Sequence, residues 1–120
     1  MDSNRDTLES MVGHHFLDSK LLDRALTHRS FSALNNERLE FLGDSVLGVI
    51  VSAILYGLYT DSEEGELTRM RAQIVKKSTL AQIARRLQLG KHLKLGGSAA
   101  KGGGTKNDSI LGDALEALIG

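Results

Sequence analysis

The chain has 120 residues, in which 15 Lys and Arg balance 15 Asp and Glu, and it contains no Cys, Pro or Trp. With 41% hydrophobic and 25% charged residues it has the composition of one globular domain, which excludes a disordered chain. The missing cysteine excludes disulfides, thiol catalysis and Cys-ligated zinc. About six prolines would be expected at average usage, so their absence favours an all-α fold.

Hydrophobic periodicity predicts the helices of the first half. Residues 7–12 form a short apolar-periodic segment, and Asp18 is a candidate N-cap for a helix that ends near residues 27–30. Asn35 or Asn36 caps a long helix that runs to about Tyr59. We expect this helix to be central and buried along one stripe, formed by Leu39, Leu42, Val46, Val49, Ile50, Ala53 and Ile54.

The uncharged run 45–60 is the only segment that resembles a membrane span. It is shorter than the roughly 18 apolar residues that a span needs, so a buried helix is the better interpretation. The N-terminus has no basic-then-apolar pattern typical of a signal peptide. These features predict a soluble cytoplasmic protein with no membrane association.

The second half is predicted to be helical as well. Residues 60–65 form a short acidic loop, residues 66–76 a helix, and Ser78 caps a further helix to about Leu87. Five glycines among residues 96–104 predict a mobile loop. The helical pattern resumes at about residue 107 and continues to the last residue, and no strand-like alternation occurs along the chain.

Five carboxylates lie on two predicted helix faces. Glu37, Glu40 and Asp44 share an arc of about 60°, and Asp113 and Glu116 are three residues apart. Acids are favoured in a first helical turn, which explains Glu37 and partly Glu40 without any function, but not Asp44. The spacing therefore leaves two interpretations open, a metal site or solvated polar faces. A site of this composition suits Mg²⁺ or Mn²⁺ rather than Zn²⁺.

Four motifs together resemble the ribonuclease III family. Residues 36–47 (NERLEFLGDSVL) resemble its signature motif, and residues 26–30 (LTHRS) precede it as in the family. Residues 64–72 (EGELTRMRA) resemble the segment after the signature helix, and residues 113–120 (DALEALIG) resemble the second acidic motif. The resemblance covers nearly the whole chain, in order and at fitting spacing.

The resemblance implies an all-α endonuclease domain, a helical bundle that acts as a homodimer on double-stranded RNA in RNA processing. It implies a Mg²⁺-dependent hydrolysis that leaves 5′-phosphate and 3′-hydroxyl ends. Asp44 and Glu116 match the acids most directly involved in catalysis. The family's metal-binding acids correspond to Glu40, Asp44, Asp113 and Glu116. Glu37 and Glu64 match acids near the scissile strand, Glu64 acting across the dimer, and Phe41 matches an aromatic residue that docks into the partner subunit.

Two further expectations follow from the resemblance. Residues 1–120 correspond to a catalytic domain truncated on its C-terminal side, without the double-stranded-RNA-binding domain that follows in bacterial relatives. Basic residues between Arg69 and Lys77 are expected to contact RNA phosphates. The alternative function is a catalytically silent RNA-binding or assembly module, because some relatives keep the fold and lose the acids. All the family's acids are present in this sequence, which favours the enzyme.

Overall fold

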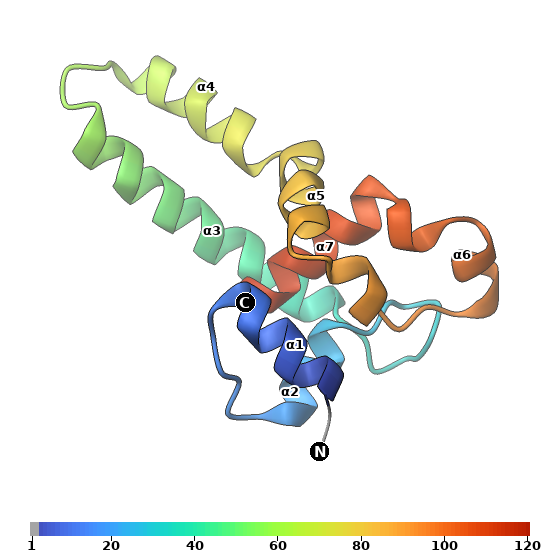
Figure 1. Ribbon diagram of the computed structural model, residues 1–120. Coiled ribbons are helices and arrows are strands. Elements are labelled where there is room, and N and C mark those ends of the chain that lie inside the picture. The colour runs from blue at the N-terminus through green and yellow to red at the C-terminus, as the bar shows by residue number, and fades with distance from the viewer. Residues whose placement is uncertain (1–2) are drawn as a thin grey trace.

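The computed structural model describes residues 3–120, and in this range the chain is all-α as predicted, with no β-strand. Its helices are α1 (Ser3–Val12), α2 (Ser19–Ala25), α3 (Glu37–Leu58), α4 (Glu64–Val75), α5 (Lys77–Arg86), η1 (Leu89–His92), α6 (Gly97–Lys101), η2 (Gly104–Lys106) and α7 (Asp108–Ile119). Helices α3 and α4 lie side by side as a long arm, and α7 crosses α3 and α5 at the base of that arm (Figure 1). Helix α7 is therefore the element around which the others are arranged.

Side-chain caps set the starts of α2 and α7, and the cap of α2 is the predicted Asp18. The prediction that Ser78 caps the next helix is wrong, because α5 already begins at Lys77 and no side chain caps it. The Asp18 carboxylate accepts hydrogen bonds from the backbone N–H groups of Lys20 and Leu21 at 3.0 and 3.3 Å. The Asn107 side chain accepts one from Ile110 at 3.0 Å. These side chains satisfy backbone donors that the first helical turn leaves unpaired.

The start of α3 uses both predicted asparagines, in different roles. The Asn35 side chain accepts a hydrogen bond from the Glu37 N–H at 3.0 Å. The buried Asn36 side chain instead donates to the Ala25 carbonyl at 3.1 Å, tying α3 to the end of α2. Helix α4 begins at Glu64, two residues before the predicted start at Glu66, because Glu63 and Glu66 form a capping box.

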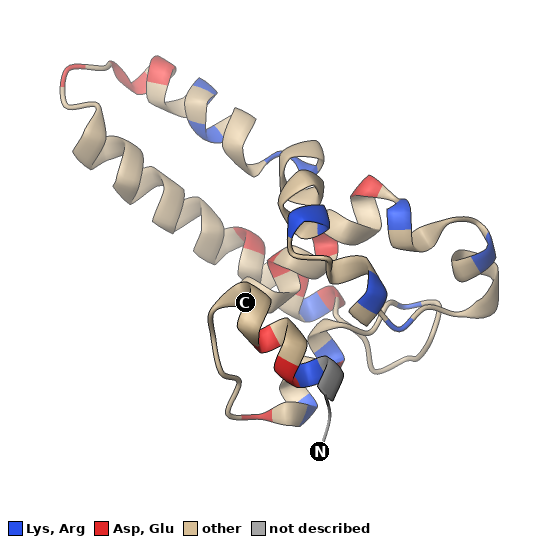
Figure 2. Ribbon diagram, in the orientation of Figure 1, with Lys and Arg blue, Asp and Glu red and all other residues tan. Residues whose placement is uncertain are grey.

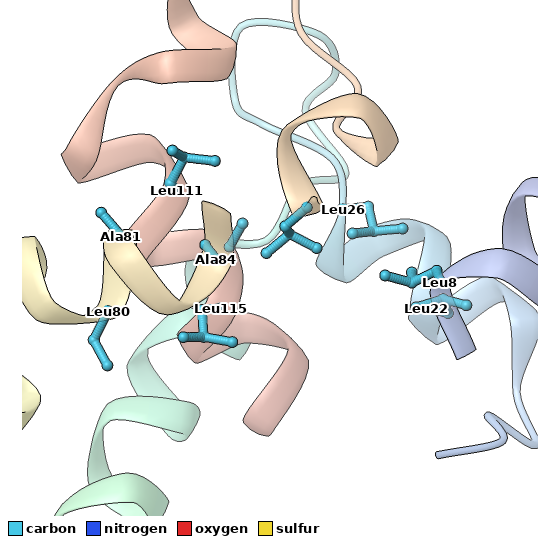
Figure 3. Packing of buried hydrophobic residues seen from close by; sticks show 10 residues of the cluster. Leu8, Leu22, Leu26, Leu80, Ala81, Ala84, Leu111 and Leu115 are labelled. Carbon is cyan, nitrogen blue, oxygen red and sulfur yellow. The ribbon is translucent and has the colours of Figure 1, made fainter. Parts of the chain in front are cut away.

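The hydrophobic core lies between α7, α5, α2 and α1. Its buried residues are Leu8, Leu22, Leu26, Leu80, Ala81, Ala84, Leu89, Leu111, Ala114 and Leu115. Figure 3 shows Ala81 and Ala84 of α5 facing Leu111 and Leu115 of α7. Alanines at this crossing let the two helices approach closely, which fixes where the acids of α7 lie. Each fully buried leucine contributes roughly 1.5–3 kcal/mol to stability.

The prediction that α3 is buried along its apolar stripe is wrong. Val49 is 69% exposed, and Leu42, Ile50 and Ile54 are also exposed. The buried positions of α3 are Gly43, Val51 and Leu55, which form a narrower face against the neighbouring helices. By length and composition alone, α3 is long and apolar enough to cross a membrane. Only 17% of its most apolar stretch of 18 residues is buried. Leu39 and Val46 are half-buried, whereas no element among residues 3–120 covers the rest of the stripe.

The predicted mobile loop at residues 96–104 is also partly wrong. The segment folds into the short helix α6 and leads into η2, and Gly104 is buried. It is attached to the N-terminal half, because the Ser30 hydroxyl accepts a hydrogen bond from the Gly96 N–H at 2.9 Å. A Cβ at residue 96 would lie 2.1 Å from the Ser30 carbonyl oxygen, so this close approach requires glycine.

Candidate active site: a carboxylate cluster where α3 and α7 cross

Three of the predicted acids converge where α3 and α7 cross. Glu40 of α3 and Asp113 and Glu116 of α7 each place a carboxylate oxygen within 4.8 Å of the others. Figure 2 shows the acidic positions of the two helices near this crossing. The i, i+3 spacing of Asp113 and Glu116 puts both on the face of α7 that meets α3. The three-acid part of the predicted cluster is thus present in the structure.

Gly43 makes the close crossing possible. A Cβ at this position would lie 1.6 Å from the Glu116 carbonyl oxygen, so any side chain would push the two helices apart. The glycine lies one turn after Glu40 on α3, directly opposite the turn of α7 that carries Glu116. The helix backbones therefore fix the separation of the acids, rather than flexible loops.

Glu116 is the most buried of the acids, with its side chain 2% exposed. Burial, with a hydrogen bond and charge interaction from Asp44, raises the pKa of Glu116 to about 7 against the lowering effect of Lys77. Burial also raises the pKa of Glu40, and the Asp113 charge adds to that shift. Burial and the neighbouring carboxylates therefore disfavour the charged forms of Glu40 and Glu116.

Asp44 lies at the edge of the cluster. Asp44 is exposed and lies one turn after Glu40 on α3. Its carboxyl group interacts with that of Glu116. It does not belong to the tight group of Glu40, Asp113 and Glu116. The four acids predicted to share one site thus form a group of three with a fourth beside it.

Lys77 occupies the middle of this acidic group, which the sequence did not reveal. Its ammonium forms ion pairs with Asp113 and Glu116 and lies 3.6 Å from a Glu40 oxygen. Burial lowers the pKa of Lys77, but hydrogen bonds and charge from Asp113 and Glu116 raise it more, so it lies above its ordinary value. No sequence pattern indicates that Lys77 lies among these acids, because it is 39 residues from Glu116. The resemblance instead predicts that this basic segment contacts RNA phosphates.

The remaining predicted site residues lie outside the tight cluster. Glu37 begins α3, and its carboxylate is 4.0 Å from the Arg29 guanidinium. Together with His28 and Asn107 these residues line a polar cavity of about 450 Å³ that also reaches Glu40 and Asp113. Glu64 is exposed at the start of α4, at the far end of the arm from α7 (Figure 1). The structure does not bring Glu64 to the cluster within one chain.

The donor set fits a hard divalent cation. Three converging carboxylates supply the oxygen ligands that Mg²⁺ and Mn²⁺ prefer, and the described residues provide no cysteine for a softer metal. Oxygen Oδ1 of Asp113 is buried, and the ammonium of Lys77 is its ion-pair partner. A buried carboxylate oxygen that already pairs with a cation lies where a metal ion could be bound in its place.

Comparisons with known proteins assign the chain to a family. The Ribonuclease-III-like family model matches residues 18–120, and the chain belongs to this family. It is 55% identical over 114 residues to Ribonuclease 3 of Bordetella avium, covering 95% of this chain and 45% of that protein. It is 50% identical over 120 residues to Ribonuclease 3 of Hahella chejuensis, covering 100% of this chain and 53% of that protein. The chain therefore spans about half the length of these curated relatives.

A solved structure confirms the fold at the level of the whole chain. The nuclease domain of ribonuclease III from Campylobacter jejuni superposes with a TM-score of 0.92 at 42% sequence identity. The match covers 93% of this chain and 79% of that one. That domain is described as having a flexible region involved in dimer formation. The helical bundle described above is thus a ribonuclease III nuclease-domain fold.

Proposed function

We propose that this chain is the nuclease domain of an endoribonuclease that hydrolyses phosphodiester bonds in double-stranded RNA, as part of RNA processing in the cytoplasm. The observation that carries the proposal is the convergence of Glu40, Asp113 and Glu116 at the crossing of α3 and α7. Family membership supports the reaction type, and the carboxylates supply the chemistry that such hydrolysis needs. The products would be 5′-phosphate and 3′-hydroxyl ends.

Glu40, Asp44, Asp113 and Glu116 would hold Mg²⁺, or Mn²⁺ in its place. When bound, such an ion lowers the pKa of a coordinated water and neutralises charge that develops on the phosphate. The chain fixes these ligands on two rigid helices, and Gly43 sets their separation. Glu116 and Asp44 act most directly, Glu116 from the buried side and Asp44 from the exposed side of the same site.

The cavity beside the cluster suits the RNA strand next to the cleaved bond. Arg29 and His28 offer hydrogen-bond donors for phosphate oxygens, and Asn107 offers an amide. Glu37 holds the Arg29 guanidinium at 4.0 Å, so it positions that donor at the mouth of the cavity. We assign Glu37 to substrate positioning on this basis.

A second copy of the chain is the proposed partner for the exposed stripe of α3. Phe41 is 78% exposed and Val49 69% exposed, and apolar side chains of this kind are normally covered in an assembly. Dimer formation by the Campylobacter jejuni nuclease domain supports a second copy of the chain, rather than a membrane, as the partner that covers this surface. In such a dimer Phe41 is the anchor, and Glu64 at the tip of the arm contributes to the partner's site.

Cleavage of a long RNA duplex tests the proposal. The purified chain should cut the duplex in Mg²⁺ and not in EDTA, and Glu116→Gln should abolish cutting while duplex binding persists. Asp61→Asn serves as a control, because Asp61 is exposed in the loop between α3 and α4. Duplex binding without Mg²⁺-dependent cutting by the wild type would contradict the enzyme and favour the silent RNA-binding module.

A further inference from the structure

The cation already present in the acidic cluster is Lys77, and the proposed function gives it no role. Its ammonium pairs with Asp113 and Glu116 and lies 3.6 Å from a Glu40 oxygen. These are the same three acids whose oxygens converge within 4.8 Å. A metal ion would need oxygens at about 2.0–2.1 Å, around the point where the ammonium now lies. The ammonium and the ion cannot both occupy that position.

We propose that Lys77 is a built-in counter-ion that fills the metal position of the free chain, and that a divalent cation binds by displacing it. The inference rests on the proposed metal-dependent function. It assigns Lys77 two effects on the same site. It stabilises the converged acids before metal arrives, and it lowers the apparent affinity for the metal.

The need for a counter-ion follows from the packing. Glu116 is 2% exposed, lies beside Asp113 on α7 and faces Glu40 and Asp44 of α3 across a narrow crossing. A buried carboxylate without a partner is strongly destabilising, and several together repel one another. Lys77 is the cation that the described residues place among these acids. Its charge therefore lets α3 and α7 cross closely in the absence of metal.

The geometry also allows Lys77 to leave without disturbing the fold. Its side chain is 42% exposed, so part of the side chain already contacts solvent. The lysine begins α5, which is anchored separately by the buried Leu80, Ala81 and Ala84. The stem passes Gly112 of α7, where a Cβ would lie 3.1 Å from the Lys77 Cδ. Rotation about the side-chain bonds is enough to release the ammonium.

Metal binding to matched variants tests displacement. Lys77→Met removes the charge and keeps an unbranched stem, and Lys76→Met is the control because Lys76 is exposed at the neighbouring position. Mn²⁺ affinity of the purified chains is measured by electron paramagnetic resonance, and the unfolding temperature by calorimetry in EDTA and in Mn²⁺. We expect Lys77→Met to bind Mn²⁺ at least fivefold more tightly, to unfold earlier in EDTA and to gain more from Mn²⁺. Lys76→Met should match the wild type.

The outcomes separate this inference from the proposed function. If the wild type binds Mn²⁺ and Lys77→Met binds it less than fivefold more tightly, displacement is overturned. The proposed metal site is not affected by that result. Absence of Mn²⁺ binding in both wild type and Lys77→Met overturns the inference together with the proposed function. Binding by Lys77→Met alone overturns displacement, because Lys77 then blocks the site in the wild type, and it contradicts the proposed metal-dependent function.

A second measurement uses the wild type and needs no variant to fold. With ¹³C-labelled lysines, the Lys77 Cε–Hε signal should move towards the position of solvent-exposed lysines as Mg²⁺ saturates the chain. The Lys76 signal should stay in place. A Lys77 signal that is unchanged at saturating Mg²⁺ overturns the proposal.

Discussion

Glu116 and Gly43 are the residues on which the site depends. They lie opposite each other where the two helices cross, and the Glu116 main-chain carbonyl occupies the space that a side chain at Gly43 would need. The glycine determines how close the helices come, and the glutamate carries the charge that this closeness buries. Both the stability of the fold and the proposed metal site therefore depend on this crossing, and each residue leads to a testable prediction.

The raised pKa of Glu116 predicts how stability depends on pH in the absence of metal. Folded Glu116 keeps its proton up to a pKa of about 7, whereas the ordinary value is 4.5. Between these values the folded state binds more protons than the unfolded state, so the free energy of unfolding falls as pH rises from about 4.5 to 7. We expect a loss of roughly 3 kcal/mol, measured by urea denaturation in EDTA.

Glu116→Gln should remove most of this pH dependence. Glu40, whose pKa is also raised, leaves a smaller slope in the same direction. The groups that face Glu116 are Lys77 from α5, Asp44 and Glu40 from α3, and Asp113 from α7. Asp61→Asn should retain the full slope. An unchanged slope in Glu116→Gln would show that the pH dependence has another origin.

Gly43→Ala should destabilise the chain by about 1–3 kcal/mol, because its methyl group has no room against the Glu116 carbonyl. Gly57→Ala is the matched control, since it lies on the same helix with no atom within 4 Å of the added carbon. That variant should be neutral or more stable by up to about 1 kcal/mol, because alanine favours helix. Thermal unfolding of the two variants measures the difference. Equal stability would mean that α3 and α7 do not cross as closely as described.

At the scale of the helices, the sequence predicted where elements lie better than how they pack. Caps are local, so Asp18 could be identified from its neighbours alone. The direction of an apolar stripe is not local. The periodicity of α3 indicated a buried face, but it could not indicate whether the covering surface lies in the same chain. Val49 and Ile50 are apolar, yet they are exposed in the structure.

Phe41→Ala should weaken self-association of the chain. An exposed aromatic anchor near the centre of an interface typically contributes 2 kcal/mol or more, so the dimer dissociation constant should rise by about 30-fold. Leu17→Ala is the control, because Leu17 is 94% exposed in the loop between α1 and α2. Sedimentation equilibrium over a dilution series measures both variants. Identical association of Phe41→Ala and the wild type would exclude Phe41 as the anchor.

At the scale of the whole molecule, the acids of two distant motifs form one site because α7 packs against α3 and α5 at once. The helical spacing of the acids predicted their shared faces, and the resemblance to ribonuclease III joined the two motifs. Neither could predict Lys77, because its place among the acids depends on how α5 is docked on α7. The packing of Leu80 and Ala84 against Leu111 and Leu115 brings that lysine to the cluster.

The central claim is that the acids of α3 and α7 form a divalent-metal site. Anomalous diffraction from crystals soaked in Mn²⁺ tests it most directly. We expect an anomalous peak between Glu40, Asp113 and Glu116, close to Asp44, with the Lys77 ammonium moved out of the cluster. Crystals that show no peak there, with Lys77 still paired to Asp113 and Glu116 at saturating Mn²⁺, would contradict it.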